Sequence, residues 1–164
     1  MTLVAVVDDE ESVRRGLGRL LRGAGYEVAM FAGGAEFLES LSRARPACVL
    51  VDGSMPGMDG REVLERLSRL PERVPAVVVS GRGSAADREA AAALGAVAFL
   101  AKPFYPEDLL KAVAAAVVRP SAGTGRLEQG RTGTGSGVLC LDPRRVRRPF
   151  GSASTTVVID DAGC

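Results

Sequence analysis

Three carboxylates are the residues best placed to do chemistry in this sequence. Asp8 and Asp9 follow the apolar run 3–7, and Asp52 follows the apolar run 47–51. Two carboxylates about 5 Å apart repel each other by roughly 3 kcal/mol at an effective dielectric constant near 20, so a group of three requires a cation. Mg²⁺ suits such a sparse oxygen site, because it binds few carboxylates and completes its shell with water and phosphate oxygens. The pattern predicts a Mg²⁺ site, provided that the two runs are adjacent strands.

A serine and a lysine complete the set. Ser80 follows the apolar run 76–79, and Lys102 comes shortly after the run 97–100. The ammonium group of Lys102 would pair with a phosphate oxygen as a point charge, and the hydroxyl of Ser80 would donate a hydrogen bond to another oxygen. These residue types predict a carboxylate, Asp52, that accepts a phosphoryl group between a metal, an ammonium group and a hydroxyl.

Alternating strands and helices must position these side chains. Helical spacing of apolar residues, or an alanine-rich helix-forming stretch at 85–94, follows each of five short apolar runs. Five alternations predict parallel βαβ units with helices on both faces of the sheet. Ligands of such sheets bind at the carboxyl ends of the strands, where the polar residues above are expected to meet. The predicted strands are 3–7, 27–31, 47–51, 76–79 and 97–100.

Composition excludes several other functions. The 164 residues contain no histidine, which excludes Ser-His-Asp and Cys-His catalysis. The three cysteines are scattered and fit neither a disulfide framework nor a zinc-ligand pattern. No apolar run reaches the roughly 18 residues of a membrane span, and the first residues lack the basic start of a signal peptide. We therefore expect a cytoplasmic protein that does not enter a membrane.

Charge and glycine content divide the chain into two parts. Residues 1–118 carry 14 Lys and Arg against 16 Asp and Glu, so no basic face for nucleic acid is expected there. Residues 119–164 carry 7 against 4 and are rich in glycine. They show no helix-turn-helix pattern, and their composition is typical of a flexible or disordered tail. A solvated appendage is favoured over a nucleic-acid or membrane arm.

Four motifs resemble the receiver domain of two-component response regulators, particularly those of the nitrogen-fixation regulator type. They are residues 6–10 (VVDDE), 50–60 (LVDGSMPGMDG), 79–81 (VSG) and 99–104 (FLAKPF). The resemblance covers about residues 3–118, and it implies a flavodoxin-like (βα)5 doubly wound parallel sheet with strand order 2-1-3-4-5. It also implies a signalling module that catalyses only its own phosphorylation and dephosphorylation.

The resemblance implies a role for each site residue. Asp52 would accept a phosphoryl group from the phosphohistidine of a sensor histidine kinase. Asp8, Asp9, Asp52 and the backbone carbonyl of Ser54 would hold Mg²⁺. Lys102 would bind the phosphoryl group.

It further implies a switch. Ser80 would move toward the phosphoryl oxygens, and Phe99 would follow inward and remodel the face built from the fourth helix, fifth strand and fifth helix. That face would contact a downstream protein, or a second copy in a phosphorylation-dependent homodimer. The peptide bond between Lys102 and Pro103 is expected to be cis.

Some residues also have purely structural explanations. Asp8 and Glu11 could cap the first helix, whereas Asp59 is expected to cap the third and to stay outside the site. Gly53 stands where receivers usually have a bulkier residue, and Ser54 is small at a position that controls water access, so the phosphoryl lifetime stays open.

Two other functions compete with the receiver interpretation. A truncated or frame-shifted DNA-binding regulator would lack its output domain, and residues 119–164 show no helix-turn-helix pattern. A Mg²⁺-dependent aspartyl phosphatase would place its nucleophile after the first strand and a second acid two residues later, whereas here Ser54 lies two residues after Asp52.

Overall fold

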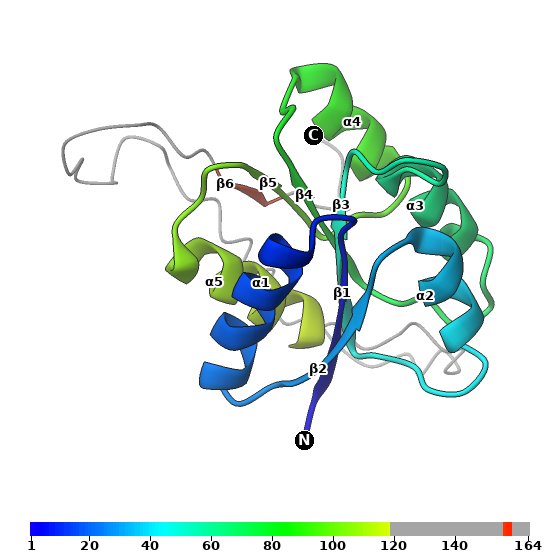
Figure 1. The fold of residues 1–164 in the computed structure, drawn as a ribbon. Coiled ribbons are helices and arrows are strands. Elements are labelled where there is room, and N and C mark those ends of the chain that lie inside the picture. The colour runs from blue at the N-terminus through cyan, green and yellow to red at the C-terminus, as the bar shows by residue number, and fades with distance from the viewer. Residues whose placement is uncertain (119–155, 159–164) are drawn as a thin grey trace, which may run out of the picture.

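The computed structural model describes residues 1–118 and 156–158. Strands and helices alternate along the chain (Figure 1), as the apolar pattern predicts. The strands are β1 (Leu3–Val7), β2 (Glu27–Phe31), β3 (Cys48–Asp52), β4 (Ala76–Ser80), β5 (Ala98–Ala101) and β6 (Thr156–Val158). The helices are α1 (Glu11–Gly23), α2 (Gly34–Ser40), α3 (Gly60–Ser68), α4 (Ala85–Ala93) and α5 (Pro106–Val118).

The strands form one sheet in the order β2-β1-β3-β4-β5-β6. The first five are parallel, which confirms the predicted order 2-1-3-4-5. β6 pairs antiparallel with β5 and adds a sixth strand that the sequence pattern does not predict. The prediction of a flexible tail otherwise concerns residues 119–155 and 159–164, which lie outside the described residues.

Helices cover both faces of the sheet, with α1 and α5 on one side and α2, α3 and α4 on the other (Figure 1). β3 and β4 are buried along their whole length, which explains why their sequences are continuous apolar runs rather than alternating ones. Each face has its own apolar cluster, centred on Phe37 and Val63 on one side and on Leu21 and Leu109 on the other.

Helix ends follow the local sequence. Ser84 caps α4 in a reciprocal capping box with Asp87. Gly95 follows the end of that helix with φ +86°, a conformation that glycine adopts without a Cβ penalty. Pro106 occupies the first position of α5, where its missing N–H is not needed.

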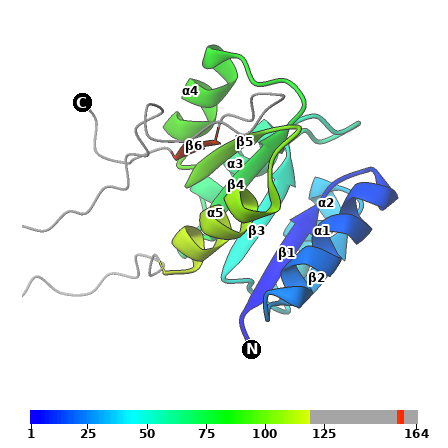
Figure 2. The ribbon, with the colours of Figure 1, turned by 90° about the vertical axis from the view of Figure 1, so that its left-hand side faces the viewer.

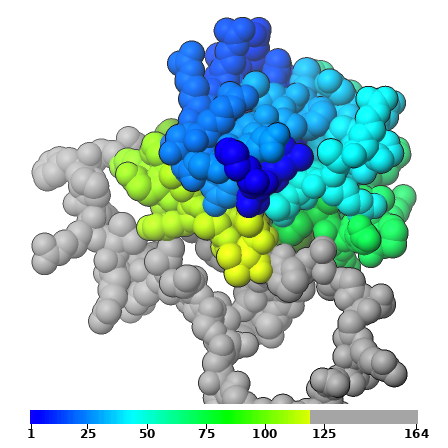
Figure 3. All heavy atoms as spheres, turned by 90° about the horizontal axis from the view of Figure 1, so that it is seen from below, coloured from blue at the N-terminus to red at the C-terminus, as the bar shows by residue number. Residues whose placement is uncertain are grey.

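The N-terminus precedes β1 and lies at the end of the sheet opposite the carboxyl ends of the parallel strands (Figure 1), and Figure 3 shows the molecule from this end. A hollow at this end is lined by Arg45, Glu72, Arg73 and Val117, among others, and contains none of the predicted site residues. Among the described residues, no helix has the length and apolarity needed to cross a bilayer.

Candidate functional site

The three predicted carboxylates meet at one end of the sheet. Asp8 and Asp9 directly follow β1, and Asp52 is the last residue of β3, which pairs in parallel with β1. One carboxylate oxygen from each lies within 4.8 Å of the others. Asp8 and Asp52 are buried, with 2% and 7% of their surface exposed, whereas Asp9 is exposed. The adjacency on which the predicted cation site depends is therefore confirmed.

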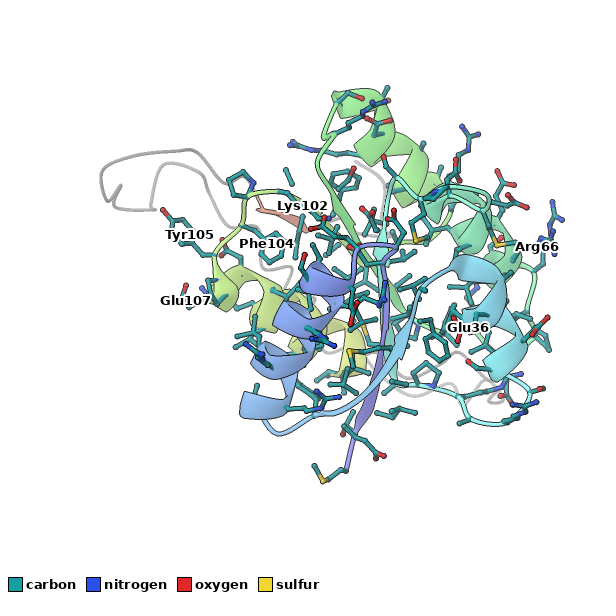
Figure 4. The ribbon with its side chains drawn as sticks, in the orientation of Figure 1. Glu36, Arg66, Lys102, Phe104, Tyr105 and Glu107 are labelled. Carbon is teal, nitrogen blue, oxygen red and sulfur yellow. The ribbon has the colours of Figure 1, made fainter. Side chains whose placement is uncertain are left out.

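Lys102 reaches this acidic group from the loop after β5. Its Nζ atom lies 3.4 Å from Oδ2 of Asp8 and 3.5 Å from Oδ1 of Asp52. Figure 4 shows Lys102 at this edge of the sheet, ahead of Phe104 and the start of α5. The Lys102–Pro103 peptide bond is cis, as the resemblance implied.

Electrostatics disfavour the charged form of Asp52 and favour a cation at the site. The pKa of the Asp52 carboxyl is raised, mainly because burial removes water from the charged form. The ammonium group of Lys102 opposes this shift, the charge of Asp8 adds to it, and hydrogen bonds from Ser54 and Lys102 oppose it. One lysine faces three carboxylates, so the donor set retains excess negative charge and fits a divalent cation with oxygen ligands.

Asp8 is held by the backbone of Glu10 and by Arg14 of α1. Its Oδ1 accepts a hydrogen bond from the backbone N–H of Glu10 at 2.8 Å, and its carbonyl accepts one from Arg14 at 2.6 Å. Glu10 is the N-cap of α1 and makes no side-chain capping bond, so neither Asp8 nor Glu11 is the cap. Sequence reasoning missed Arg14, since one arginine in a helical segment carries no signal of its contact.

Ser80, the last residue of β4, is turned toward the loop after it. Its Oγ donates a hydrogen bond to the carbonyl of Arg82 at 2.8 Å and accepts one from the backbone N–H of Arg82 at 3.1 Å. Only 3% of Ser80 is exposed. A Cβ atom at Gly53 would lie 2.9 Å from both Cβ and Oγ of Ser80. The glycine after Asp52 therefore provides the space that Ser80 occupies.

The loop after Asp52 ends where α3 begins. Asp59 caps this helix by accepting a hydrogen bond from the backbone N–H of Glu62 at 2.9 Å, which confirms its predicted structural role. Gly57 has φ +82°, a backbone conformation that favours glycine in a turn. A Cβ at Gly60 would collide with the backbone carbonyl of Asp52. Gly60 lets α3 approach the backbone of the site.

Phe99 lies on β5 with 2% of its surface exposed and belongs to the core cluster beneath α2, α3 and α4. The guanidinium carbon of Arg88, on α4, lies 5.9 Å from the centre of the Phe99 ring, which is cation–π distance. Sequence reasoning did not single out Arg88, because α4 has a weak apolar periodicity that leaves its inner face undefined.

Comparisons with known proteins agree with this geometry. The family model of the response regulator receiver domain matches residues 4–114. The chain is 34% identical over 116 residues to response regulator protein TodT of Pseudomonas putida, covering 71% of this chain and 51% of TodT. It is 40% identical over 116 residues to transcriptional regulatory protein PrrA of Mycobacterium tuberculosis, covering 71% and 50%. The chain thus spans about half the length of these curated relatives.

A solved structure shows the same fold. The Vibrio cholerae chemotaxis protein CheY4 superposes with a TM-score of 0.65 at 32% identity, over 71% of this chain and 98% of that one. Receiver domains are signalling modules rather than conventional enzymes. With the family model covering residues 4–114, this chain belongs to the receiver-domain family of two-component response regulators.

Proposed function

We propose that Asp52 accepts a phosphoryl group from the phosphohistidine of a sensor histidine kinase. The observation that carries the proposal is the convergence of the Asp8 and Asp52 carboxylates on the Lys102 ammonium group at the carboxyl end of the sheet. A carboxylate is a weak nucleophile, and its reaction with a phosphorylated histidine needs positive charge around the transferring group.

Each residue has a place in this transfer. An Asp52 carboxylate oxygen forms the new bond to phosphorus as the bond from phosphorus to the histidine nitrogen breaks. Lys102, now ion-paired with Asp52 and Asp8, pairs with a phosphoryl oxygen. Asp8, Asp9, Asp52 and the carbonyl of Ser54 would hold Mg²⁺. When bound, Mg²⁺ supplies charge neutralisation for the carboxylates and the phosphoryl oxygens.

Ser80 and Phe99 carry the response in this proposal. The hydroxyl of Ser80 leaves the Arg82 carbonyl and donates to a phosphoryl oxygen instead, which releases the loop that leads into α4. Phe99 is already buried beneath Arg88, so its response is a repacking against α4 rather than a movement from solvent. The face formed by α4, β5 and α5 is the proposed contact for a downstream protein or a second phosphorylated copy.

The proposed cellular role is that of a phosphorelay module in the cytoplasm. The names of TodT and PrrA as response and transcriptional regulators support this role, since both share the matched region. A second candidate is the receiver part of a truncated or frame-shifted DNA-binding regulator, because PrrA is a transcriptional regulatory protein about half covered by the match. Translating the DNA beyond the coding region in all frames tests this candidate. A helix-turn-helix in another frame favours truncation, and the absence of one argues against it. The aspartyl phosphatase gains no support, since position 54 is serine.

Labelling with a small phosphodonor tests the proposed function. The protein incubated with acetyl phosphate and Mg²⁺ should gain one phosphoryl group that maps to Asp52 and is lost in both acid and base, as an acyl phosphate is, and EDTA should abolish the labelling. Asp52→Asn should remove the label. The matched control is Asp59→Asn, because Asn caps a helix as well as Asp and Asp59 lies outside the carboxylate cluster. Unmodified Asp52 under saturating donor, or equal labelling of Asp52→Asn, would refute the proposal.

A further inference from the structure

The β5 edge of the sheet, which belongs to the proposed contact face, differs in character from the other edge. β2 forms the other edge, and it carries an exposed charge at Glu27 and an exposed Met30, as edge strands that avoid pairing commonly do. β5 instead presents Ala98, Phe99 and Leu100, which are all buried and uncharged. A strand of this kind would leave unpaired N–H and C=O groups at an apolar edge, which is a template for another strand.

Residues 156–158 of the same chain occupy that edge. β6 pairs antiparallel with β5 in the register Ala98 to Val158, Phe99 to Val157 and Leu100 to Thr156. Figure 2 shows β6 beside β5, on the side away from β4. All three residues of β6 are β-branched, the class with the strongest preference for strands. The rest of residues 119–164 is rich in glycine and arginine.

We propose that residues 156–158 form an intramolecular strap, and that the β5 edge is a strand-accepting site which this strap keeps closed. The site would take an extended peptide segment with β-branched residues, bound through main-chain hydrogen bonds. A partner that adds a strand to β5 must first displace the strap. The inference does not depend on which residue is phosphorylated.

The energetics fit a removable cover. A ladder of three residue pairs is short, and an isolated two-stranded pairing of this length is marginal in water. Attachment to the same chain compensates, because pairing within one chain gives the strap an effective concentration on the order of millimolar. A free peptide of the same sequence must exceed that concentration to compete, whereas a partner with additional contacts need not.

Proline variants of the full chain test the strap. Proline has no N–H to donate to a strand ladder. Along an edge strand, the backbone N–H groups point alternately toward the neighbouring strand and away from it. Val157→Pro with Val158→Pro therefore removes at least one ladder donor. Thr132→Pro with Thr134→Pro, placed before the strap, is the matched control with the same number of prolines. Amide hydrogen exchange at residues 98–101, measured by NMR, should accelerate about tenfold or more in the strap variant and stay unchanged in the control.

Peptide binding provides the second readout. A peptide of residues 154–160 (STTVVID) should shift the amide signals of β5 in the strap variant, and not in the unaltered protein or the control variant at submillimolar concentration. The same peptide with prolines at the two valine positions should not bind. Unchanged protection of the β1 and β3 amides verifies that the variant is folded, and Val157→Gly with Val158→Gly should give an intermediate effect if the proline variant does not fold.

Three results would overturn the proposal. Equal exchange at β5 in the strap variant and the unaltered protein would show that residues 156–158 do not protect this edge. Protection that rises with protein concentration would assign the pairing strand to a second copy. Equal peptide binding by both proteins would show that the edge is not closed.

Discussion

The ammonium nitrogen of Lys102 lies 3.5 Å from Oδ1 of Asp52, although β4 lies between β3, which ends at Asp52, and β5, which Lys102 follows. The two side chains meet because β3, β4 and β5 are parallel and end at the same edge of the sheet. Lys102 is the only lysine or arginine for which the described residues show an ion pair with either buried carboxylate. Removing its charge therefore leaves Asp8 and Asp52 facing each other.

Lys102→Met should lower the free energy of unfolding by about 2 kcal/mol in EDTA, because a buried charge that loses its partner keeps its desolvation cost. Urea denaturation at pH 7 measures the change. Mg²⁺ should restore part of the loss by supplying another cation. Lys111→Met, on the exposed surface of α5, is the control and should change stability by less than about 0.5 kcal/mol. Equal effects of the two substitutions would show that the ion pairs contribute nothing.

Asp52→Asn should stabilise the metal-free protein, and more so at higher pH. The raised pKa of Asp52 means that the folded state binds its proton more tightly than the unfolded state does. The contribution of the protonated Asp52 carboxyl to the free energy of unfolding is fully present below the unfolded pKa of about 3.9, and it is lost as pH rises through the raised folded pKa. The difference in unfolding free energy between Asp52→Asn and the unaltered protein, from urea titrations in EDTA, should grow from pH 4 upward and then level off. A difference that shrinks as pH rises would contradict the cause assigned here.

Gly53→Ala should destabilise the protein by about 1–3 kcal/mol, because its Cβ would overlap Ser80. Ser80→Gly in the same chain should recover most of that loss, since it removes both atoms that the new methyl group meets. Chemical denaturation of the single and double variants gives the coupling energy. Gly16→Ala is the matched control: no atom lies within 4 Å of its Cβ position in α1, so it should stabilise by roughly 0.5–1 kcal/mol. Additive effects at positions 53 and 80 would rule out the contact.

Cys48 should react with thiol reagents only when the sheet opens. The residue is buried in β3, and burial raises the pKa of its thiol to about 12, so almost no thiolate exists at pH 8. In a Cys140→Ser, Cys164→Ser background, the rate of modification should follow global unfolding and increase with urea. Fast modification under native conditions would show that β3 opens locally.

The pattern of apolar residues predicts where the five parallel strands and the residues at their ends lie in the sequence, because apolar runs and the glycines that end helices are local properties of the chain. Asp8, Asp52 and Lys102 are expected at one edge for the same reason, and the structure brings them together. The expected metal, phosphoryl transfer and switch still rest on the family resemblance and on experiments to come.

Contacts between distant segments are what the sequence does not reveal. Arg14 on the Asp8 carbonyl and Arg88 over Phe99 are surface-like arginines until the helices pack. Gly53 looked like an anomaly, and only the position of Ser80 explains it. The pairing of residues 156–158 with β5 joins segments far apart in the chain, and a three-residue apolar stretch does not specify its partner.

The hydroxyl of Ser80 has one proton, and that proton is engaged by the peptide carbonyl of Arg82. An acceptor that arrives beside Asp52 and the Arg82 carbonyl therefore cannot both be satisfied at once. The hydrogen bond that holds the loop before α4 and a hydrogen bond to a group bound at Asp52 therefore exclude each other, because both need the same Ser80 proton. In the proposed switch, rotation of the Ser80 side chain would couple the arrival of a phosphoryl oxygen to the release of the loop that leads into α4.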